Sequence, residues 1–422
     1  MKIAYFSQAA YRALPDGFEH QYESCVTTPY SLTTPEAMYS SYRDFMDELM
    51  LAARSGYDAV AVTEHAQSSY DMVPNPSLIA SALAYMTEAE GLDVAVYPLG
   101  RSLGKSREPV KVAEEMAMID VMSGGRTVVG FPVGLSYDAC MNNGVEPMNL
   151  RGRFDENLEL ILRAWRDPEP FAHNGRFSQY PSVNIWPRPL QQPRPPVYIT
   201  GVGNPRTMRQ TLERNFGFNY FGWFGAKMTG RVMFDRFWDQ ADELGLPRNP
   251  FRLAFMQVIG VSETDEQARR DYAEHVEYSF RRGLGSIPIE KLSLPGAIDI
   301  NGVKALVRDP SDFGMYSQLK SATYDELREA GCIIAGSPAT VREELGEYCK
   351  TYGIGNLLAM LNFGSLPREL TMKNIRMFAE EVAPYLRDIW KDSGYEHHWW
   401  PERLGGKPLG DEADLTLAAG AA

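Results

Sequence analysis

Short apolar runs alternate with stretches of helical periodicity along most of the chain. This alternation indicates a parallel sheet whose strands are joined by crossover helices. The apolar runs predict strands at residues 2–7, 59–63, 93–99, 126–131, 197–200, 219–224, 252–261 and 356–361.

Helical patterns occupy the segments between these runs. Eight strands with helices between them predict a (β/α)8 barrel, the TIM-barrel fold. The expected helices lie near residues 39–54, 77–90, 109–122, 153–166, 205–215, 232–244, 266–281, 338–352 and 368–386.

The 422 residues exceed the ~250 of a bare barrel, so we expect insertions after strands 1, 4 and 7. Residues 8–35 form an aromatic, Pro-containing loop after the first strand, and residues 167–196 are rich in Pro and turn signals. Residues 283–336 carry no clear period, which favours a lid-like insertion. We expect a single barrel over residues 1–390 and a C-terminal tail over residues 391–422.

Composition narrows the class of protein. The formal net charge of −13 gives no basic surface for nucleic acid or an anionic membrane. No apolar run approaches the length of a membrane span, and the N-terminus reads as a strand rather than a secretory signal. The cysteines lack the CxxC spacing of a zinc site or a disulfide framework, which favours the reducing cytoplasm. They are Cys25, Cys140, Cys332 and Cys349.

The second predicted strand ends in Glu64 and His65, two groups that are costly to bury unless they are paired. A histidine in this position is often only a packing residue. TIM barrels, however, carry their catalytic groups at the carboxyl ends of the strands. The residues alone leave both interpretations open.

A glycine-containing turn follows the fifth predicted strand and includes Gly201, Gly203, Asn204, Arg206 and Thr207. Its glycines would let backbone N–H groups approach an anion at the start of the next helix, which predicts a phosphate site. An ordinary barrel turn is the alternative. Because Arg206 stands where the GxGxxG fingerprint requires glycine, a Rossmann dinucleotide site is excluded.

The stretch VAEEMAMIDVMSGGRTVVGFPVG at residues 112–134 resembles the helix–strand signature of the bacterial luciferase-like flavin-dependent monooxygenases. Other landmarks resemble the same family in order and spacing. They are SGYDAVAVTEHA (55–66), RGRFDENLELILRAW (151–165) and GSPATVREELGEY (336–348). The resemblance covers roughly residues 1–390.

The resemblance implies a two-component monooxygenase that takes reduced FMN from a separate NAD(P)H:flavin reductase. Such an enzyme reacts the flavin with O2 to a C4a-peroxyflavin and oxygenates a small organic substrate, as a homodimer or homotetramer. The aromatic first loop favours an apolar or aromatic substrate. An F420-dependent hydride-transfer oxidoreductase and a non-catalytic flavin-binding accessory protein are the alternatives, and the presence of His65 speaks against the accessory protein.

The resemblance also assigns roles to the polar residues. His65 matches the family histidine beside the flavin and would donate or accept a proton, with Glu64 as its structural partner. Val133 replaces the family arginine that reaches the flavin phosphate. Either Arg206, Arg151 or Arg153 supplies that charge instead, or the site binds FMN weakly, as would suit an enzyme that takes reduced flavin as a diffusible substrate.

Aromatic residues are the candidates for the substrate pocket. Tyr11 and Tyr22 would either wall the pocket or only pack the first loop, and Trp223 after the sixth strand would either cover the flavin ring or belong to the core. We expect no metal site, because the adjacent His397 and His398 cannot both face one ion from a regular helix.

Overall fold

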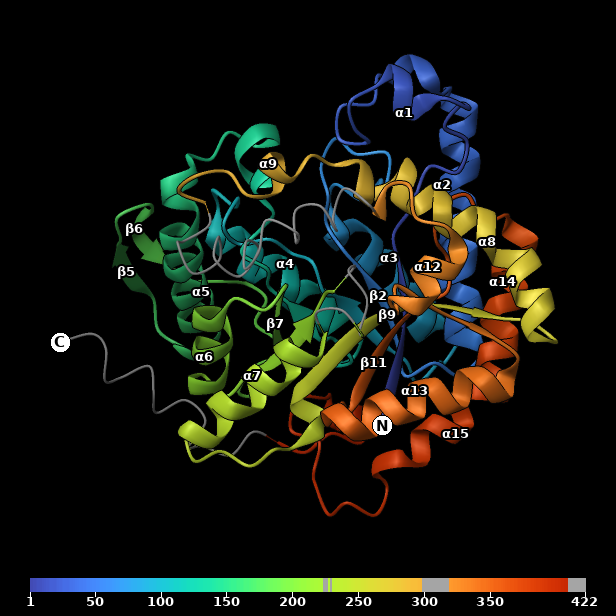
Figure 1. Cartoon of the computed structure of the whole chain (residues 1–422). Helices are drawn as coiled ribbons and strands as arrows, with labels where there is room; N and C mark the ends of the chain where they lie inside the picture. Colours follow the sequence, from blue (N-terminus) through green and yellow to red (C-terminus); the bar gives the residue numbers. More distant parts are fainter. Residues whose placement is uncertain (223–226, 228–229, 298–318, 409–422) are drawn as a thin grey trace.

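The computed structural model describes residues 1–222, 227, 230–297 and 319–408, and its parallel strands form a central sheet surrounded by helices (Figure 1). β11 pairs with β1, and a bridge between Val96 and Thr127 joins β3 to the segment that leads into β4, so the sheet closes. The predicted (β/α)8 barrel is therefore confirmed. In spatial order the ring contains β1 (Lys2–Ser7), β2 (Ala59–Val62), β3 (Ala95–Pro98), β4 (Val129–Gly130), β7 (Val197–Gly201), β8 (Gly217–Tyr220), β9 (Leu253–Val261) and β11 (Asn356–Met360).

Local signals in the sequence set where the helices begin. Several helices carry proline in the first turn and a side-chain cap on the residue before it, as Thr34, Asn75, Asn204 and Ser337 show. The longer helices are α2 (Pro35–Arg54), α3 (Pro76–Ala89), α4 (Pro109–Met122), α5 (Leu150–Arg166), α6 (Pro205–Glu213), α7 (Arg231–Glu243), α8 (Asp265–Arg281), α13 (Pro338–Tyr352) and α14 (Arg368–Met377). The shorter ones are α1 (Phe18–Gln21), α9 (Ile289–Leu292), α12 (Tyr324–Glu329) and α15 (Ala383–Arg387).

Side chains alternate between two apolar layers along each barrel strand, as the period of a strand requires. One set, including Ile3, Tyr5 and Val60, packs with helix residues such as Leu49. The other set fills the interior of the ring and is unusually rich in alanine. Its members include Ala4, Phe6, Ala59, Ala61, Ala95, Tyr97 and Tyr198. Small and large residues together therefore fill a narrow barrel.

Two strand regions were missed at the sequence level. β10 (Ile333–Gly336) pairs with the second half of β9, and the hairpin of β5 (Phe171–Asn174) and β6 (Gln179–Val183) lies within the Pro-rich segment. The sixth barrel strand, β8, also begins two residues before its prediction. The hairpin strands are largely exposed, so no apolar run marks them. β10 lies within the segment that was interpreted as one insertion.

The predicted lid-like insertion at residues 283–336 is only partly within the described residues, since 298–318 lie outside them. Its described parts contain α9, α12 and β10, and β10 belongs to the central sheet. The predicted boundary at residue 336 therefore lies too far along the chain.

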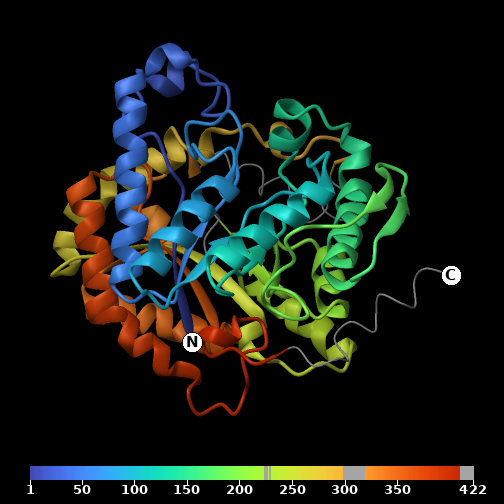
Figure 2. The same cartoon turned by 180° about the vertical axis from the view of Figure 1, so that it is seen from behind.

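The C-terminal segment closes the end of the barrel where the strands begin. Trp399 and Trp400 are buried with the interior side chains, and Trp399 donates its indole N–H to the carbonyl of Asn215, 3.0 Å away, just before β8. Figure 2 shows this red segment beside the N-terminus. Residues 397–401 of the predicted tail are thus packed into the fold, whereas residues 391–396 are exposed.

Candidate active site

Three loops meet at the opposite end of the barrel, where β2, β3 and β4 end. Gly100 lies so close to the backbone of Thr63 that an added Cβ would approach it to 2.6 Å. Gly104 lies equally close to Val133, where a Cβ would meet the carbonyl oxygen at 2.2 Å. Glycine at both positions therefore lets the loops pack against one another and fixes the side chains that they carry.

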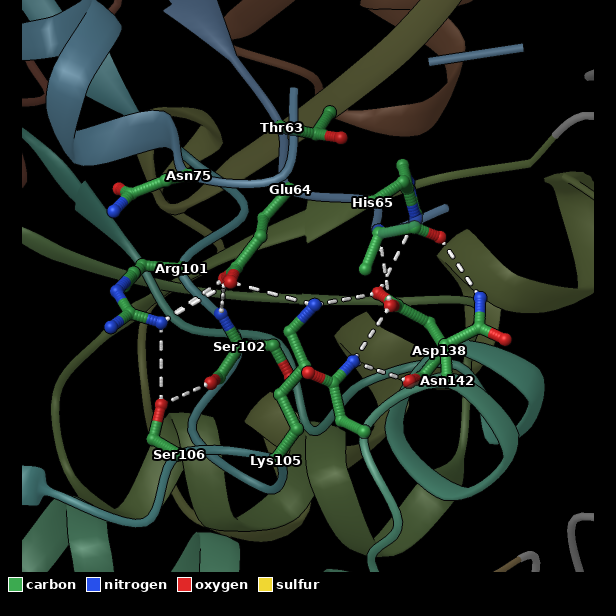
Figure 3. Close-up of polar contacts among 12 residues, drawn as sticks. Thr63, Glu64, His65, Asn75, Arg101, Ser102, Lys105, Ser106, Asp138 and Asn142 are labelled. Carbon is green, nitrogen blue, oxygen red and sulfur yellow. Dashed lines mark hydrogen bonds and ion pairs between the residues drawn. The ribbon is translucent and has the colours of Figure 1, made fainter. Parts of the chain in front are cut away.

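A chain of buried charges crosses these loops. The Lys105 ammonium lies 2.8 Å from Asp138 Oδ2 and 3.4 Å from Glu64 Oε1, and its side chain is only 5% exposed. Glu64 also accepts from the backbone N–H of Ser102 at 2.8 Å and from Arg101 Nη1 at 3.2 Å. Figure 3 shows the ammonium between the two carboxylates. Because each buried charge has an opposite partner, the cost of removing it from water is offset.

His65 adjoins this chain through Asp138. His65 Nδ1 lies 3.2 Å from the hydroxyl of Tyr137 and 3.7 Å from Asp138 Oδ2. The ring of Tyr70 lies 5.0 Å from the imidazole. Within the described part of the chain no hydrogen bond involves Nε2 of His65, whereas Nδ1 is oriented by its partners. The ring can therefore exchange a proton at Nε2 without losing its position.

The turn that carries Asp138 also clamps the backbone beside His65. Ala66 donates its N–H to Asp138 Oδ1 at 3.2 Å, and Asn142 donates to the carbonyl of Ala66 at 2.9 Å. Burial acts to raise the pKa of Asp138, but the hydrogen bond with His65 and the charge of Lys105 outweigh it and hold that pKa below its usual value. Asp138 is therefore ionised at neutral pH.

A second carboxyl, Asp71, lies on the β2 side of the site. It accepts from the hydroxyl of Thr63 at 2.8 Å and from the N–H of Val73 at 3.1 Å. Burial raises its pKa, while the nearby His65 acts in the opposite direction. The imidazole therefore contacts the carboxylate of Asp138 and interacts through its charge with Asp71.

Glu64 lies at this site but does not contact His65. Its carboxylate faces Ser102, Arg101 and Lys105, so the expected role of direct partner to His65 belongs instead to Asp138 and Tyr137. Sequence reasoning missed Lys105, Arg101 and Asp138. Their place in the sequence could have identified them, because each follows a barrel strand closely. None of them, however, lies in a contiguous motif with His65.

The predicted phosphate turn joins β7 to α6, as expected, but its helix N-terminus is already capped. Asn204 Oδ1 accepts from the N–H groups of Arg206 at 3.0 Å and Thr207 at 3.3 Å. Pro205 has no N–H, and the N–H of Met208 donates to the carbonyl of Asn204. An anion could use these backbone groups only by displacing the Asn204 side chain. Gly203 has φ +101°, a conformation that favours glycine.

Arginines of α5 and α6 surround that turn. Arg151 donates to the hydroxyl of Thr207 at 2.9 Å, and Arg206 pairs with Asp155 at 3.2 Å. The guanidinium of Arg153 lies 5.1 Å from the ring centre of Phe177, on the hairpin side. Of the predicted arginines, Arg151 and Arg206 contact residues at the start of α6, whereas Arg153 packs on the hairpin.

The aromatic candidates have different environments. Tyr11 lines a cavity beside the barrel mouth, whereas Tyr22 stacks on Phe18 at 5.1 Å within the first loop. Tyr22 therefore contributes to the packing of that loop. Trp223 lies outside the described residues.

The mouth can be tested for its fit to a flavin, which needs an apolar wall for its ring and donors for its phosphate. Phe221, which is partly exposed, packs edge to face on the fully buried Phe6 at 5.2 Å. The side chains of Arg151 and Thr207 supply donors at the neighbouring strand end. The residues present therefore fit a flavin.

The described residues were also compared with what a metal site and a membrane-spanning helix require. In the part of the chain that the structure describes, no three His, Cys, Asp or Glu side chains are grouped so as to hold a metal ion. No described helix combines the length and apolar character needed to cross a membrane.

Comparison with known proteins extends this picture. The family model described as luciferase-like monooxygenase matches residues 24–353. The oxygenase component of flavin-dependent trigonelline monooxygenase from Acinetobacter baylyi is 30% identical over 161 residues, which span 37% of this chain and 42% of that relative. 3,6-Diketocamphane 1,6-monooxygenase from Pseudomonas putida is 24% identical over 78% of this chain and 89% of its own length.

Solved structures share the fold at low identity. The oxygenating constituent of 3,6-diketocamphane monooxygenase from Pseudomonas putida, in complex with FMN, gives a TM-score of 0.68 at 20% identity, covering 91% of this chain and 98% of that one. An F420-dependent secondary alcohol dehydrogenase gives 0.63 at 16% identity, covering 92% and 99%. Proteins with this fold thus include users of either cofactor.

Proposed function

Because the chain belongs to the luciferase-like monooxygenase family, we propose that it is the oxygenase component of a two-component system. In this proposal it uses reduced FMN and O2 to oxygenate a small organic substrate. The observation that supports it most is His65, oriented by Asp138 and Tyr137 at the end of the barrel where TIM barrels perform their chemistry. The partial relationship to trigonelline monooxygenase supports the same class of reaction.

His65 is the proposed proton donor and acceptor in this reaction. Lys105 neutralises Asp138 at 2.8 Å, so the imidazole need not carry a positive charge to balance that carboxylate. A neutral imidazole can accept a proton at Nε2 and return it later, while Nδ1 remains held. We propose that Glu64 holds Lys105 and Arg101 in position and does not itself contact the reacting atoms.

Reduced FMN, when bound, would supply the electrons that activate O2. We propose that its phosphate contacts side chains rather than helix N–H groups, because Asn204 already uses the N–H groups of Arg206 and Thr207. Arg151 and Thr207 are the proposed donors. Gly201 and Gly203 shape the turn, and the phosphate role suggested for Arg153 moves to Arg151.

The partners follow from the same proposal. A separate NAD(P)H:flavin reductase would deliver the reduced flavin in the cytoplasm. We also propose a homodimer that buries the outer faces of α3 and α4, which lie side by side (Figure 2). These faces leave large apolar side chains exposed to water, which is unusual for a monomer. They are Leu78, Tyr85, Met118, Val121 and Met122.

Anaerobic titration followed by flavin absorbance tests the cofactor. We expect reduced FMN to bind more tightly than reduced F420, and oxygen consumption to follow when air is admitted with an added flavin reductase. Tighter binding of F420, with hydride transfer to a ketone in the absence of O2, would replace the proposal with the dehydrogenase alternative. Flavin binding without oxygen consumption would favour an accessory protein.

A further inference from the structure

Gln67, two residues after His65, has an unusual backbone conformation. Its φ is +54°, in the left-handed region that residues with a side chain rarely adopt. Among the non-glycine residues that the structure describes, Asn215 is the only other one with a positive φ, and asparagine tolerates this region better than glutamine does. The side chain of Gln67 is exposed, so it gains little from burial. The conformation must therefore be held by hydrogen bonds between this segment and its surroundings.

Asn142 forms two hydrogen bonds with this segment (Figure 3). Its Nδ2 donates to the carbonyl of Ala66 at 2.9 Å, and Gln67 Nε2 donates to the backbone carbonyl of Asn142 at 3.1 Å. The Ala66 carbonyl belongs to the peptide group that joins Ala66 to Gln67. Because φ of Gln67 sets the direction of that peptide group relative to the rest of the chain, a change in φ would break the bond with Asn142. Asn142 thus holds Gln67 in its left-handed conformation.

The backbone that carries the His65 ring is held at three consecutive points. The N–H of His65 donates to the carbonyl of Val73 at 3.0 Å, and the N–H of Ala66 donates to Asp138 Oδ1 at 3.2 Å. The carbonyl of Ala66, which accepts from Asn142, is the third point. Since the direction of a side chain follows its backbone, these bonds aim the imidazole. If the third bond is lost, the strained segment can relax and move the imidazole with it.

The contacts with His65 and with the backbone after it come from one turn of π-helix, Tyr137–Asn142. Hydrogen bonds in a π-helix join residues five positions apart, so Tyr137 and Asn142 lie on the same side of the turn. The 3.6 residues per turn of an α-helix would instead place these two side chains about 140° apart. In this π-turn, Tyr137 and Asp138 contact the ring of His65, and Asn142 contacts the backbone that follows it. The unusual turn therefore combines both kinds of contact in one element.

We propose that Asn142 is a positioning residue for His65: by holding Gln67 in the left-handed conformation, it fixes the direction in which the imidazole points at the barrel mouth. The inference rests on the proposed function for the identity of the reaction, but its geometry is independent of the flavin. Asn142 needs no contact with flavin or substrate in this role. Its loss should therefore lower turnover and leave the affinity for reduced FMN unchanged.

NMR of the full chain without flavin tests this role directly. Labelling histidine with carbon-13 at Cε1 gives one signal for each of the six histidines, and the signal that is missing from His65→Ala identifies His65. Asn142→Ala should shift or broaden the His65 signal. In the loaded enzyme the same variant should lower turnover by up to about 100-fold at an unchanged KM for reduced FMN, because a displacement of about 1 Å can cost a catalytic group that much.

Two variants of Gln67 test the same clamp without relying on the stability of the π-turn. Gln67→Val leaves Asn142 in place but puts a β-branched residue where φ is +54°, so it should reproduce the shift of the His65 signal and the loss of turnover. Gln67→Gly removes the strain. Added to Asn142→Ala, it should return the His65 signal towards its wild-type position and recover turnover.

Asn249 at the closed end provides the matched control, because it also donates to a backbone carbonyl, that of Glu396 at 2.8 Å. Asn249→Ala should lower the melting temperature at least as much as Asn142→Ala does, and leave the His65 signal and turnover unchanged. A wild-type His65 signal and normal turnover in Asn142→Ala would show that Asn142 only stabilises the fold and would overturn the proposal. Failure of Gln67→Gly to restore the signal would overturn the role given to Gln67.

The flavin titration separates this inference from the proposed function. A His65 signal that depends on Asn142, in a protein that binds no reduced flavin, would support the clamp and refute the monooxygenase. Binding of reduced FMN by a protein whose His65 signal does not respond to Asn142→Ala would support the flavin site and overturn the clamp.

Discussion

Two buried or half-buried histidines lie at opposite ends of the barrel, and their surroundings differ in charge. His65 at the mouth faces the carboxylate of Asp138 and has Asp71 nearby. In the part of the chain that the structure describes, His397 at the closed end forms no ion pair with a carboxylate. Lys2, the N-terminal amine and His398 lie around it, and its ring stacks on Phe251 at 4.7 Å.

The surroundings of His397 favour its neutral form. Its Nε2 donates to Asn356 Oδ1 at 2.8 Å, because the amide nitrogen of Asn356 is donating elsewhere. Its buried Nδ1 has no partner in the structure. Burial, followed by the nearby cations, lowers the pKa of His397 well below its ordinary value.

The comparison teaches that one residue type serves two purposes in this chain. The closed end gains stability from aromatic packing and excludes charge, whereas the mouth retains charges that are costly to bury and pairs them. The apolar packing of the closed end thus stabilises the fold that holds the paired charges of the mouth in place. Each of the following changes tests one side of that contrast.

The largest expected effect is at the mouth. His65→Ala should lower turnover by about 10²–10⁴-fold, the range for a positioned proton-transfer group. The melting temperature should change little, because Asp138 keeps its contacts with Lys105 and the N–H of Ala66. His173→Ala, on the surface hairpin, is the control and should leave turnover unchanged. A destabilised His65→Ala protein with normal turnover per folded molecule would show that His65 only packs.

Lys105→Met should destabilise the fold by about 3–5 kcal/mol, because it leaves the carboxylates of Glu64 and Asp138 without their shared cation. Urea denaturation measures this change in the free energy of unfolding. Lys373→Met, which removes an ion pair with exposed Glu263, is the matched control and should cost less than about 1 kcal/mol. Equal losses for the two variants would contradict the buried network.

Trp400→Ala tests the closed end. Trp400 is 3% exposed, so its truncation should cost about 3–5 kcal/mol of stability. Turnover per folded molecule should stay unchanged, since the residue lies far from the mouth. Trp186→Ala, at a position 82% exposed, should leave stability nearly unchanged. A loss of turnover in Trp400→Ala without loss of stability would contradict the assignment of stability to the closed end and of catalysis to the mouth.

The smallest effect is the pH dependence of stability at His397. Its pKa in the folded state is depressed, so the unfolded chain binds more protons below pH ~6.5. Stability should therefore fall as the pH drops below that value, by up to about 1.4 kcal/mol per pH unit. His397→Gln should flatten this slope, as urea denaturation between pH 5 and 7 would measure. An unchanged slope would show that His397 binds protons equally in the folded and unfolded states, which would contradict its lowered pKa.

Much of the fold was predictable from the apolar pattern, because long barrel helices and buried strands carry strong periodic signals. Residues 109–122 and 338–352 were predicted with the same bounds that α4 and α13 show. The β5–β6 hairpin was not predicted because its strands are largely exposed and polar, and β10 was not because it lies within a segment without a clear period.

The site was less predictable than the fold. His65 and Glu64 could be found because they follow a clear strand, but the partner of His65 depends on how three loops pack. Lys105 contacts Asp138, 33 positions away along the chain, through a turn that Gly104 allows. No local pattern encodes such a contact. The cap of Asn204 shows the same limit: the turn was located correctly, but its N–H groups were already in use.

The most direct test of the account is rapid mixing of the anaerobic complex of protein and reduced FMN with oxygenated buffer, followed by flavin absorbance. If the chain is an oxygenase in which His65 transfers a proton, flavin oxidation should proceed in at least two phases. The slower phase should be altered in His65→Ala and unchanged in Trp400→Ala. A single phase with the rate of free reduced FMN, identical in all three proteins, would contradict it.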